Sequence, residues 1–306
     1  MPLNLAIVVL AAAAAAFPTD TTLAVGPETR LQLHNLLGDI DIQTWSRDAV
    51  RIRAAHSPRE RIVIERRGPV LVVDARPRSG PPGEVDFRLV VPRGMPVSLD
   101  GVRTSAKVRD LDGDVSIQTI NGEIAVLGGD GNVLLSTIQG LISVVGTRGR
   151  LEVNSVDGEI RLLEIAGHIF AETVNGAVAL RRVVSDSVEV STVNGDLCYD
   201  GAIAGAGRYR FRTHNGDIAV GLPEQTGATV TLATYRGEID SDFPLRVGEK
   251  GEHNRFKLRL GDGRAHLDLE SFGGAIRLRR PGADSTAAWL PCRLPEGKDK
   301  KEEGKR

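Results

Sequence analysis

Apolar and polar residues alternate along most of this chain, and glycine-containing turns interrupt the alternation at regular intervals. A segment such as Val115-Ser116-Ile117-Gln118-Thr119 has a period of two, which predicts a β-strand with one buried and one solvated face. No stretch beyond residue 16 keeps a period of 3.6, so we expect almost no helix there. The turns recur at a constant spacing at eight glycines: Gly113, Gly122, Gly131, Gly140, Gly149, Gly158, Gly167 and Gly176.

A longer repeat, twice the spacing of the glycines, underlies these turns. The turn Thr119-Ile120-Asn121-Gly122-Glu123-Ile124 resembles the second turn after it more closely than the turn that follows it directly. Its Asn-Gly pair is typical of a backbone position with positive φ. The related turns begin at Thr137, Ser155 and Thr173 and, with looser spacing, at Thr192, Thr213, Thr234 and Ser271.

Each unit is too small to bury its own apolar face, so stacked units must share a core. Two strands and two turns per unit predict an all-β fold, a flat two-sided β-solenoid (β-helix) of about 18 residues per coil with coils about 4.8 Å apart. An antiparallel meander is the alternative, because four-residue connections also suit hairpins. The longer period favours the solenoid, whose inward positions would be Val115, Ile117, Ile124, Val126, Val133, Leu135, Ile142, Val144, Leu151, Val153, Ile160 and Leu162.

The alternation extends toward the N-terminus but is less regular there. Because solenoid ends expose unpaired strand edges, we expect hairpins between Leu31 and Arg53, and the segment after Ile276, to cap the stack. The resulting division is a signal peptide at 1–16, an N-terminal β-strand segment continuous with the repeats at 17–100, β-solenoid repeats at 101–280, and a charged tail at 281–306 that we expect to be disordered.

The first residues indicate export. Leu5 to Ala16 is an unbroken apolar run, too short for a membrane span and typical of the apolar core of a signal peptide, although Met1 to Asn4 has no Lys or Arg. We therefore expect a periplasmic, cell-surface or extracellular protein with no integral span after signal removal. In such a compartment the two cysteines, Cys198 and Cys292, could form one bridge; the alternative is a buried apolar Cys198 and a free thiol at Cys292.

Composition narrows the choice of partners. Aromatic residues make up 4% of the chain, which suits a thin aliphatic interior. The formal net charge is -1, so the chain lacks the basic character that binding to phosphate backbones requires, and we expect no nucleic-acid partner.

Several motifs together resemble a bacterial family of candidate adhesins of unknown function built from β-strand repeats. They are Gly38-Asp39-Ile40, Trp45-Ser46-Arg47-Asp48, Val91-Pro92-Arg93-Gly94 and the serial Thr-Val-Asn-Gly-Asp-Leu turns, and the resemblance covers about residues 27 to 280. It implies an exported or envelope-associated protein with a β-helix-like domain. The chain lacks the N-terminal zinc-ribbon or membrane span of some members.

One column of residues could carry chemistry. Asp196, Asp217 and Glu238 each follow a turn glycine, and on adjacent coils their carboxylates would lie about 5 Å apart, near the spacing of retaining glycosidases. The other interpretation is a solvated edge. The Thr and Ser residues that open the turns are in phase with the inward positions, so we expect their hydroxyls to bond to backbone.

No other constellation points to catalysis. The six histidines occur singly, without metal-ligand spacing, and we expect no metal and no cofactor. No nucleophile elbow or phosphate-binding loop is present. The sequence therefore favours a non-enzymatic exported protein, an adhesin-like or envelope scaffold surface for a glycan or an envelope protein. The alternative is a carbohydrate-active β-helix enzyme that uses Asp196, Asp217 and Glu238.

Overall fold

The computed structural model describes residues 19–244 and 255–280, which form strands and no helix. The strands of the N-terminal part are β1 (Thr19–Ala24), β2 (Arg30–Trp45), β3 (Ala49–His56), β4 (Glu60–Arg67), β5 (Val70–Pro77), β6 (Val85–Pro92) and β7 (Val97–Arg109). The regular array contains β8 (Val115–Asn121), β9 (Ile124–Leu127), β10 (Val133–Gln139), β11 (Ile142–Val145), β12 (Arg148–Asp157), β13 (Ile160–Leu163), β14 (Ala166–Asn175) and β15 (Val178–Asn194). The C-terminal part contains β16 (Leu197–Asn215), β17 (Ile218–Gly221), β18 (Ala228–Thr234), β19 (Ile239–Ser241), β20 (Arg255–Leu260), β21 (Ala265–Ser271) and β22 (Ile276–Arg279).

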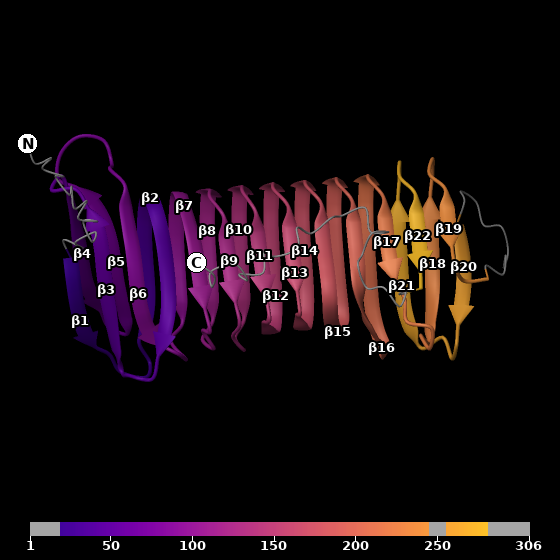
Figure 1. Cartoon of the computed structure of the whole chain (residues 1–306), viewed down its shortest axis with the longest axis horizontal. Coiled ribbons are helices and arrows are strands. Elements are labelled where there is room, and N and C mark those ends of the chain that lie inside the picture. The colour runs from indigo at the N-terminus through magenta and orange to yellow at the C-terminus, as the bar shows by residue number, and fades with distance from the viewer. Residues whose placement is uncertain (1–18, 245–254, 281–306) are drawn as a thin grey trace, which may run out of the picture.

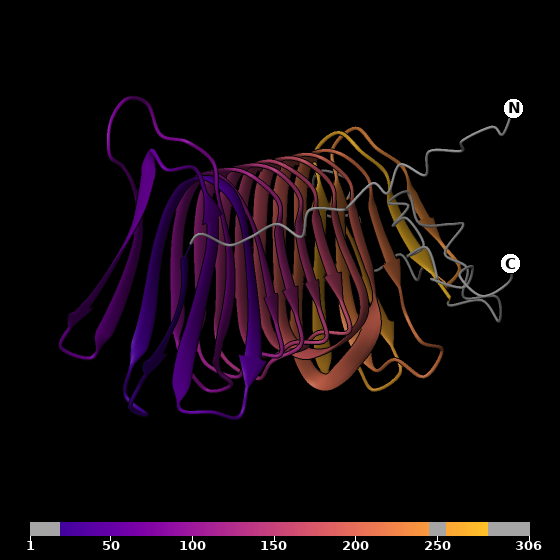
Figure 2. The same cartoon turned by 60° about the vertical axis from the view of Figure 1, so that its left-hand side comes forward.

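The array is a parallel β-solenoid, as the longer repeat period predicted. Strands β8, β10 and β12 pair in parallel on the first face, with Val133 opposite both Val115 and Leu151. Strands β9, β11 and β13 pair in the same way on the second face. The coils lie side by side along the long axis (Figure 1), and the two faces enclose a narrow interior (Figure 2). The antiparallel meander is therefore wrong for this part of the chain.

The interior follows the predicted alternation. All twelve predicted inward residues are buried, with exposed fractions of at most 6%. The coils lengthen toward the C-terminal end, where Ile169 pairs with Val188 and Val188 pairs with Tyr209, steps along the chain that are longer than the regular repeat. Rings fill the interior there, because Tyr199 contacts both Tyr209 and Phe211.

Coils and antiparallel strands together form the N-terminal end. Strand β2 pairs in parallel with β7 and forms a coil of the solenoid. The prediction of hairpins between Leu31 and Arg53 is therefore wrong for this strand. Strands β5 and β6 form the next coil outward. The hairpin β4–β5 and the antiparallel strands β3 and β1 then cover this end, which confirms a β-hairpin cap.

At the C-terminal end the order of coils in space differs from their order in sequence. The coil formed by β21 and β22 lies between the coil of β16 and β17 and the coil of β18 and β19. Strand β20 pairs antiparallel with β18 beyond it. The residues from Ile276 to Arg279 are therefore internal, and the expectation that the segment after Ile276 caps the stack is wrong for these residues.

The turn glycines are required mainly by close stacking. A Cβ added at Gly195 would lie 2.0 Å from the carbonyl oxygen of Gly176, and one at Gly216 would lie 2.0 Å from that of Gly195. Gly140 has a φ of +139°, but Gly195 and Gly216 have no positive φ. The predicted positive φ thus accounts for some of these glycines, whereas the approach of neighbouring coils accounts for all three.

Three sequence predictions fall wholly or partly outside the described residues. They are the signal peptide at 1–16, the charged tail at 281–306, and the bridge from Cys198 to Cys292, because residue 292 lies there. Cys198 itself is buried and disulfide-bonded. Within the described part of the chain, no helix is long and apolar enough to cross a membrane.

Candidate functional site

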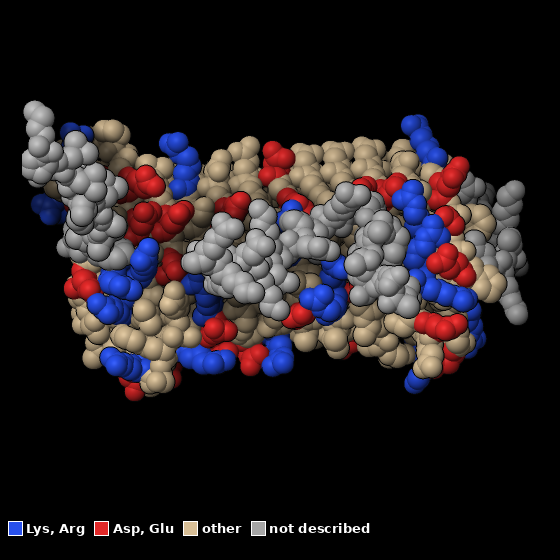
Figure 3. Space-filling view, in the orientation of Figure 1, with Lys and Arg blue, Asp and Glu red and all other residues tan. Residues whose placement is uncertain are grey.

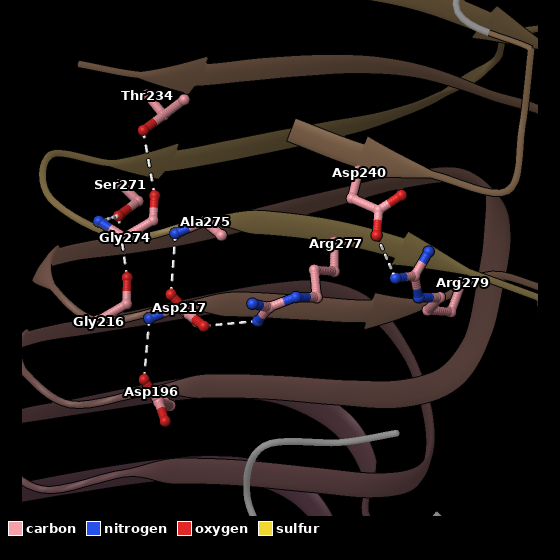
Figure 4. A network of polar contacts seen from close by, with 10 residues as sticks. All are labelled: Asp196, Gly216, Asp217, Thr234, Asp240, Ser271, Gly274, Ala275, Arg277 and Arg279. Carbon is pink, nitrogen blue, oxygen red and sulfur yellow. Dashed lines mark hydrogen bonds and ion pairs between the residues drawn. The ribbon is translucent and has the colours of Figure 1, made fainter. Parts of the chain in front are cut away.

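The structure brings two of the three predicted carboxylates together. Asp196 and Asp217 follow the turn glycines of neighbouring coils, and the backbone N–H of Asp217 donates to Oδ1 of Asp196 at 2.8 Å. In turn, Oδ1 of Asp217 accepts a bond of 2.8 Å from the N–H of Ala275 (Figure 4). Each carboxylate therefore ties its own coil to the next one.

Glu238 is not adjacent to them. The inserted coil puts Ala275 between Asp217 and Glu238, so those two carboxyl positions lie two coils, roughly 10 Å, apart. Their predicted contact on adjacent coils is wrong because the turn that begins at Ser271 lies between those that begin at Thr213 and Thr234 (Figure 4).

Arginines on the second face neutralise the carboxylates at this end. Arg277 Nη1 lies 2.5 Å from Oδ2 of Asp217. Arg279 pairs with Asp240 and, at 3.1 Å, with Asp242. The hydrogen bond from Arg279 lowers the pKa of the Asp240 carboxyl. These contacts hold the charges in ion pairs, and among the described residues no group of three or more His, Cys, Asp or Glu side chains could hold a metal ion.

The Thr and Ser column has the structural role that its phase predicted. Thr192, Thr213 and Ser271 are buried, and their hydroxyls donate to the carbonyl of the turn glycine one coil away at 3.2, 3.0 and 2.9 Å. These bonds satisfy the backbone where each strand bends into its turn. Ser155 of the same column is buried as well, but its Oγ has no hydrogen-bond partner among the described residues, so the expected backbone bond is missing there.

The next position of the same turns forms a row of apolar and aromatic side chains, which we call the ridge; all are exposed except the half-buried Val102 and Phe272. In spatial order it contains Leu36, Val102, Ile120, Ile138, Val156, Val174, Val193, His214, Phe272 and Tyr235, one per coil, as the strand registers show. Nine steps of about 4.8 Å make it about 43 Å long.

Exposure on the ridge is high for side chains of this kind. Ile120, Ile138 and Tyr235 are 48%, 47% and 48% exposed. Seven of the nine exposed large apolar side chains among the described residues belong to the ridge. Single exposed apolar residues are ordinary, but a continuous row of them is typical of an interaction surface.

Beside the ridge, along the regular array, runs a column of mainly amide side chains, interrupted by the acidic Asp157. The amides bond to each other from coil to coil: Asn121 to Gln139 at 3.2 Å, Asn194 to Asn175 at 2.8 Å and Asn215 to Asn194 at 2.9 Å. The upper edge in Figure 3 is correspondingly mostly tan over the middle of the molecule. The ridge thus presents apolar groups next to a row of hydrogen-bonding groups.

Rings replace aliphatic side chains at the C-terminal end of the ridge. His214 stacks on Phe272 with ring centroids 4.6 Å apart, and Tyr235 lies 5.2 Å from Phe272 on the other neighbouring coil. Beside them, Arg212 Nε lies 3.6 Å from Glu270 Oε2. These residues line an open hollow of about 540 Å³ at this end of the ridge.

The ridge was not among the sites predicted from the sequence, although the repeat contains a pattern that indicates it. Ile or Val fills the second position of the turns from Ile120 to Val193, one residue out of phase with the inward positions. An apolar residue that recurs out of phase must point to solvent, so this column could have been identified from the repeat alone.

Comparisons with known proteins place the chain in a family. Residues 91–279, more than half of the chain, match the family described as Toastrack DUF4097. None of the curated proteins compared with the chain matches it significantly.

Two solved structures are similar to this one at low sequence identity. A candidate cell adhesion protein from Clostridium sporogenes is 11% identical, with 86% of this chain and 99% of that chain covered and a TM-score of 0.24. A candidate adhesin from Parabacteroides merdae is 10% identical, with 85% and 95% covered and a TM-score of 0.29. On the strength of the family match, this chain belongs to the Toastrack DUF4097 family.

Proposed function

We propose that this protein is a non-enzymatic, adhesin-like binding protein that is exported and contacts its partner along the ridge. The observation that carries the proposal is the concentration of exposed apolar side chains in this one row. Water contact with a continuous apolar row is unfavourable, so a partner that covers it gains the free energy of apolar burial.

The shape of the molecule supports the same role. A solenoid positions one side chain per coil at a fixed spacing, which makes an extended surface rather than a deep cleft. The amides beside the ridge add hydrogen-bond partners without adding charge. Such a surface suits an extended ligand, and a glycan or a surface protein of the envelope has the required combination of apolar and polar groups.

The test is a combined screen for binding and cleavage. Purified protein is applied to an array of bacterial and host glycans, matrix proteins and envelope proteins, and soluble products are analysed from the same wells. The proposal predicts saturable binding without released fragments. Released oligosaccharide would support the carbohydrate-active enzyme instead, and the absence of both signals would contradict an adhesin-like role.

A further inference from the structure

The hollow at the C-terminal end of the ridge has an apolar wall and a polar wall. His214, Phe272 and Tyr235 supply rings from three successive coils, and Arg212 and Glu270 supply charged groups from two of these coils. The volume of about 540 Å³ lies within the range of roughly 300–1,000 Å³ that is usual for small-molecule sites. Apolar walls with a few polar groups are typical of such sites.

The inserted coil creates this arrangement. Strand β21 pairs with β16, which puts Glu270 opposite Arg212. Because Ala233 of β18 is in register with Glu270, a stack in sequence order would put an alanine beside Arg212 instead. Ser191 lies on the other side of Arg212 in the same outward column. The charged pair is therefore flanked by two short side chains, which leave space for a ligand beside it.

The charged pair can both donate and accept hydrogen bonds. Arg212 Nε lies 3.6 Å from Glu270 Oε2, too far for a hydrogen bond, and the two side chains are 51% and 36% exposed. A guanidinium only donates and an ionised carboxylate only accepts. Their opposite charges cancel, and the guanidinium of Arg236 lies over the Phe272 ring, 5.4 Å from its centroid. The pair therefore favours an uncharged ligand with donors and acceptors close together.

The backbone at the hollow offers little to a peptide strand. Peptides that bind to sheets do so mainly through main-chain hydrogen bonds with an unpaired strand edge. Here β16 pairs with β15 and β21, and β21 pairs with β16 and β18, so both strands are paired on both sides. The hydroxyls of Thr192 and Thr213 donate to backbone carbonyls. Recognition in the hollow must therefore depend on side chains.

We propose that the hollow binds the sugar residue at the end of an uncharged glycan. Neighbouring hydroxyls of one sugar ring accept from Arg212 and donate to Glu270, and its C–H groups pack against the rings of His214, Phe272 and Tyr235. This inference rests on the proposed function, because the rest of the glycan lies along the ridge. The ridge then supplies contact area, whereas the hollow selects the arrangement of hydroxyls.

The first test uses three small probes: methyl β-glucoside, methyl β-galactoside and methyl α-mannoside. Saturation-transfer NMR on the full chain is expected to show transfer to the C–H protons of at least one probe. In Glu270→Gln the signal should fall at least about tenfold, because a hydrogen bond to a charged group is lost. The matched control is Glu189→Gln, which alters another exposed ion pair of the same face, 3.1 Å from Arg210. No transfer to any probe, or equal signals in the two variants, would overturn the proposal.

Ring variants test the apolar wall. His214→Ala should lose the transfer signal, and His214→Phe should keep it, because a phenyl ring replaces the imidazole against Phe272. His214 is exposed, so both variants are expected to keep the fold. Equal signals in the two variants would overturn the role of the rings.

The hollow and the ridge can fail separately. Ile138→Glu with Val174→Glu changes ridge residues that do not line the hollow, so it should keep the transfer signal of the methyl glycosides while it weakens binding in the glycan screen. Glycan binding that needs the ridge but is unchanged in Glu270→Gln and His214→Ala would overturn the hollow and leave the proposed function standing. Binding of proteins alone in the screen would also overturn the hollow as a sugar site.

Discussion

Substitution of one turn glycine tests the stacking of the coils. In Gly195→Ala the new Cβ would lie 2.0 Å from the oxygen and 2.5 Å from the carbon of the Gly176 carbonyl. Because no Cβ tolerates such contacts, the two coils must separate locally by more than about 1 Å. The bonds that cross this gap join Gly176 N to Asn194 O, Val178 N to Asp196 O, and Thr192 Oγ1 to Gly176 O.

The expected loss follows from these three bonds. At about 1 kcal/mol each, their weakening lowers the free energy of unfolding by about 3 kcal/mol. The matched control is Gly94→Ala, where a Cβ meets nothing within 4 Å and φ is not positive; it is expected to be neutral or to stabilise by up to about 1 kcal/mol. Urea unfolding followed by circular dichroism measures both. An equal midpoint for the two variants would refute the argument that close approach, rather than turn flexibility, requires glycine.

Three other variants, one of them with a matched control, test separate parts of the account. Burial raises the pKa of the Tyr199 phenol above its ordinary value of 10.0, so its contribution to stability is complete below about pH 10 and is lost as the pH rises further. As the pH rises from about 8 to about 11, Tyr199→Phe should therefore lose less thermal stability than the wild type does. At neutral pH the same variant should be about 1 kcal/mol less stable than the wild type, because it lacks the 2.8 Å bond to Ala202. Thr213→Val removes the buried bond to the Gly195 carbonyl and should cost about 1–2 kcal/mol in chemical unfolding, whereas the exposed Thr22→Val should cost almost nothing. The double variant Asp196→Asn and Asp217→Asn should lower stability by about 1 kcal/mol without changing any product signal in the glycan screen; a lost cleavage activity would instead assign these carboxylates a catalytic role.

Much of the fold could be predicted because the signal is local and repeated. Each inward position, such as Ile117 or Leu135, is specified by its phase within its own strand. The pairing of Asp196 with Asp217 follows from their equivalent places after the turn glycines of successive coils, although these two residues are 21 positions apart, more than the regular repeat. What repeats in the sequence therefore repeats in the structure.

The order of the last coils could not be predicted in this way. The turns that begin at Thr213, Thr234 and Ser271 have similar residues, so nothing local distinguishes which of them stack together. The structure stacks the Ser271 turn on the Thr213 turn, and this choice separates Glu238 from Asp217 and brings Phe272 between His214 and Tyr235. Such a choice depends on the packing of whole coils, which no short motif encodes.

The most direct test of the central claim is the effect of charge on the ridge. The screen is repeated with Ile138→Glu combined with Val174→Glu, two ridge positions, and with the control Val184→Glu, which changes an apolar side chain that is 63% exposed at the opposite edge of the solenoid. All three side chains are exposed, so each variant is expected to keep the fold. The account predicts that binding falls at least about tenfold in the ridge variant and is unchanged in the control. Binding that survives both ridge substitutions would show that the partner is recognised elsewhere.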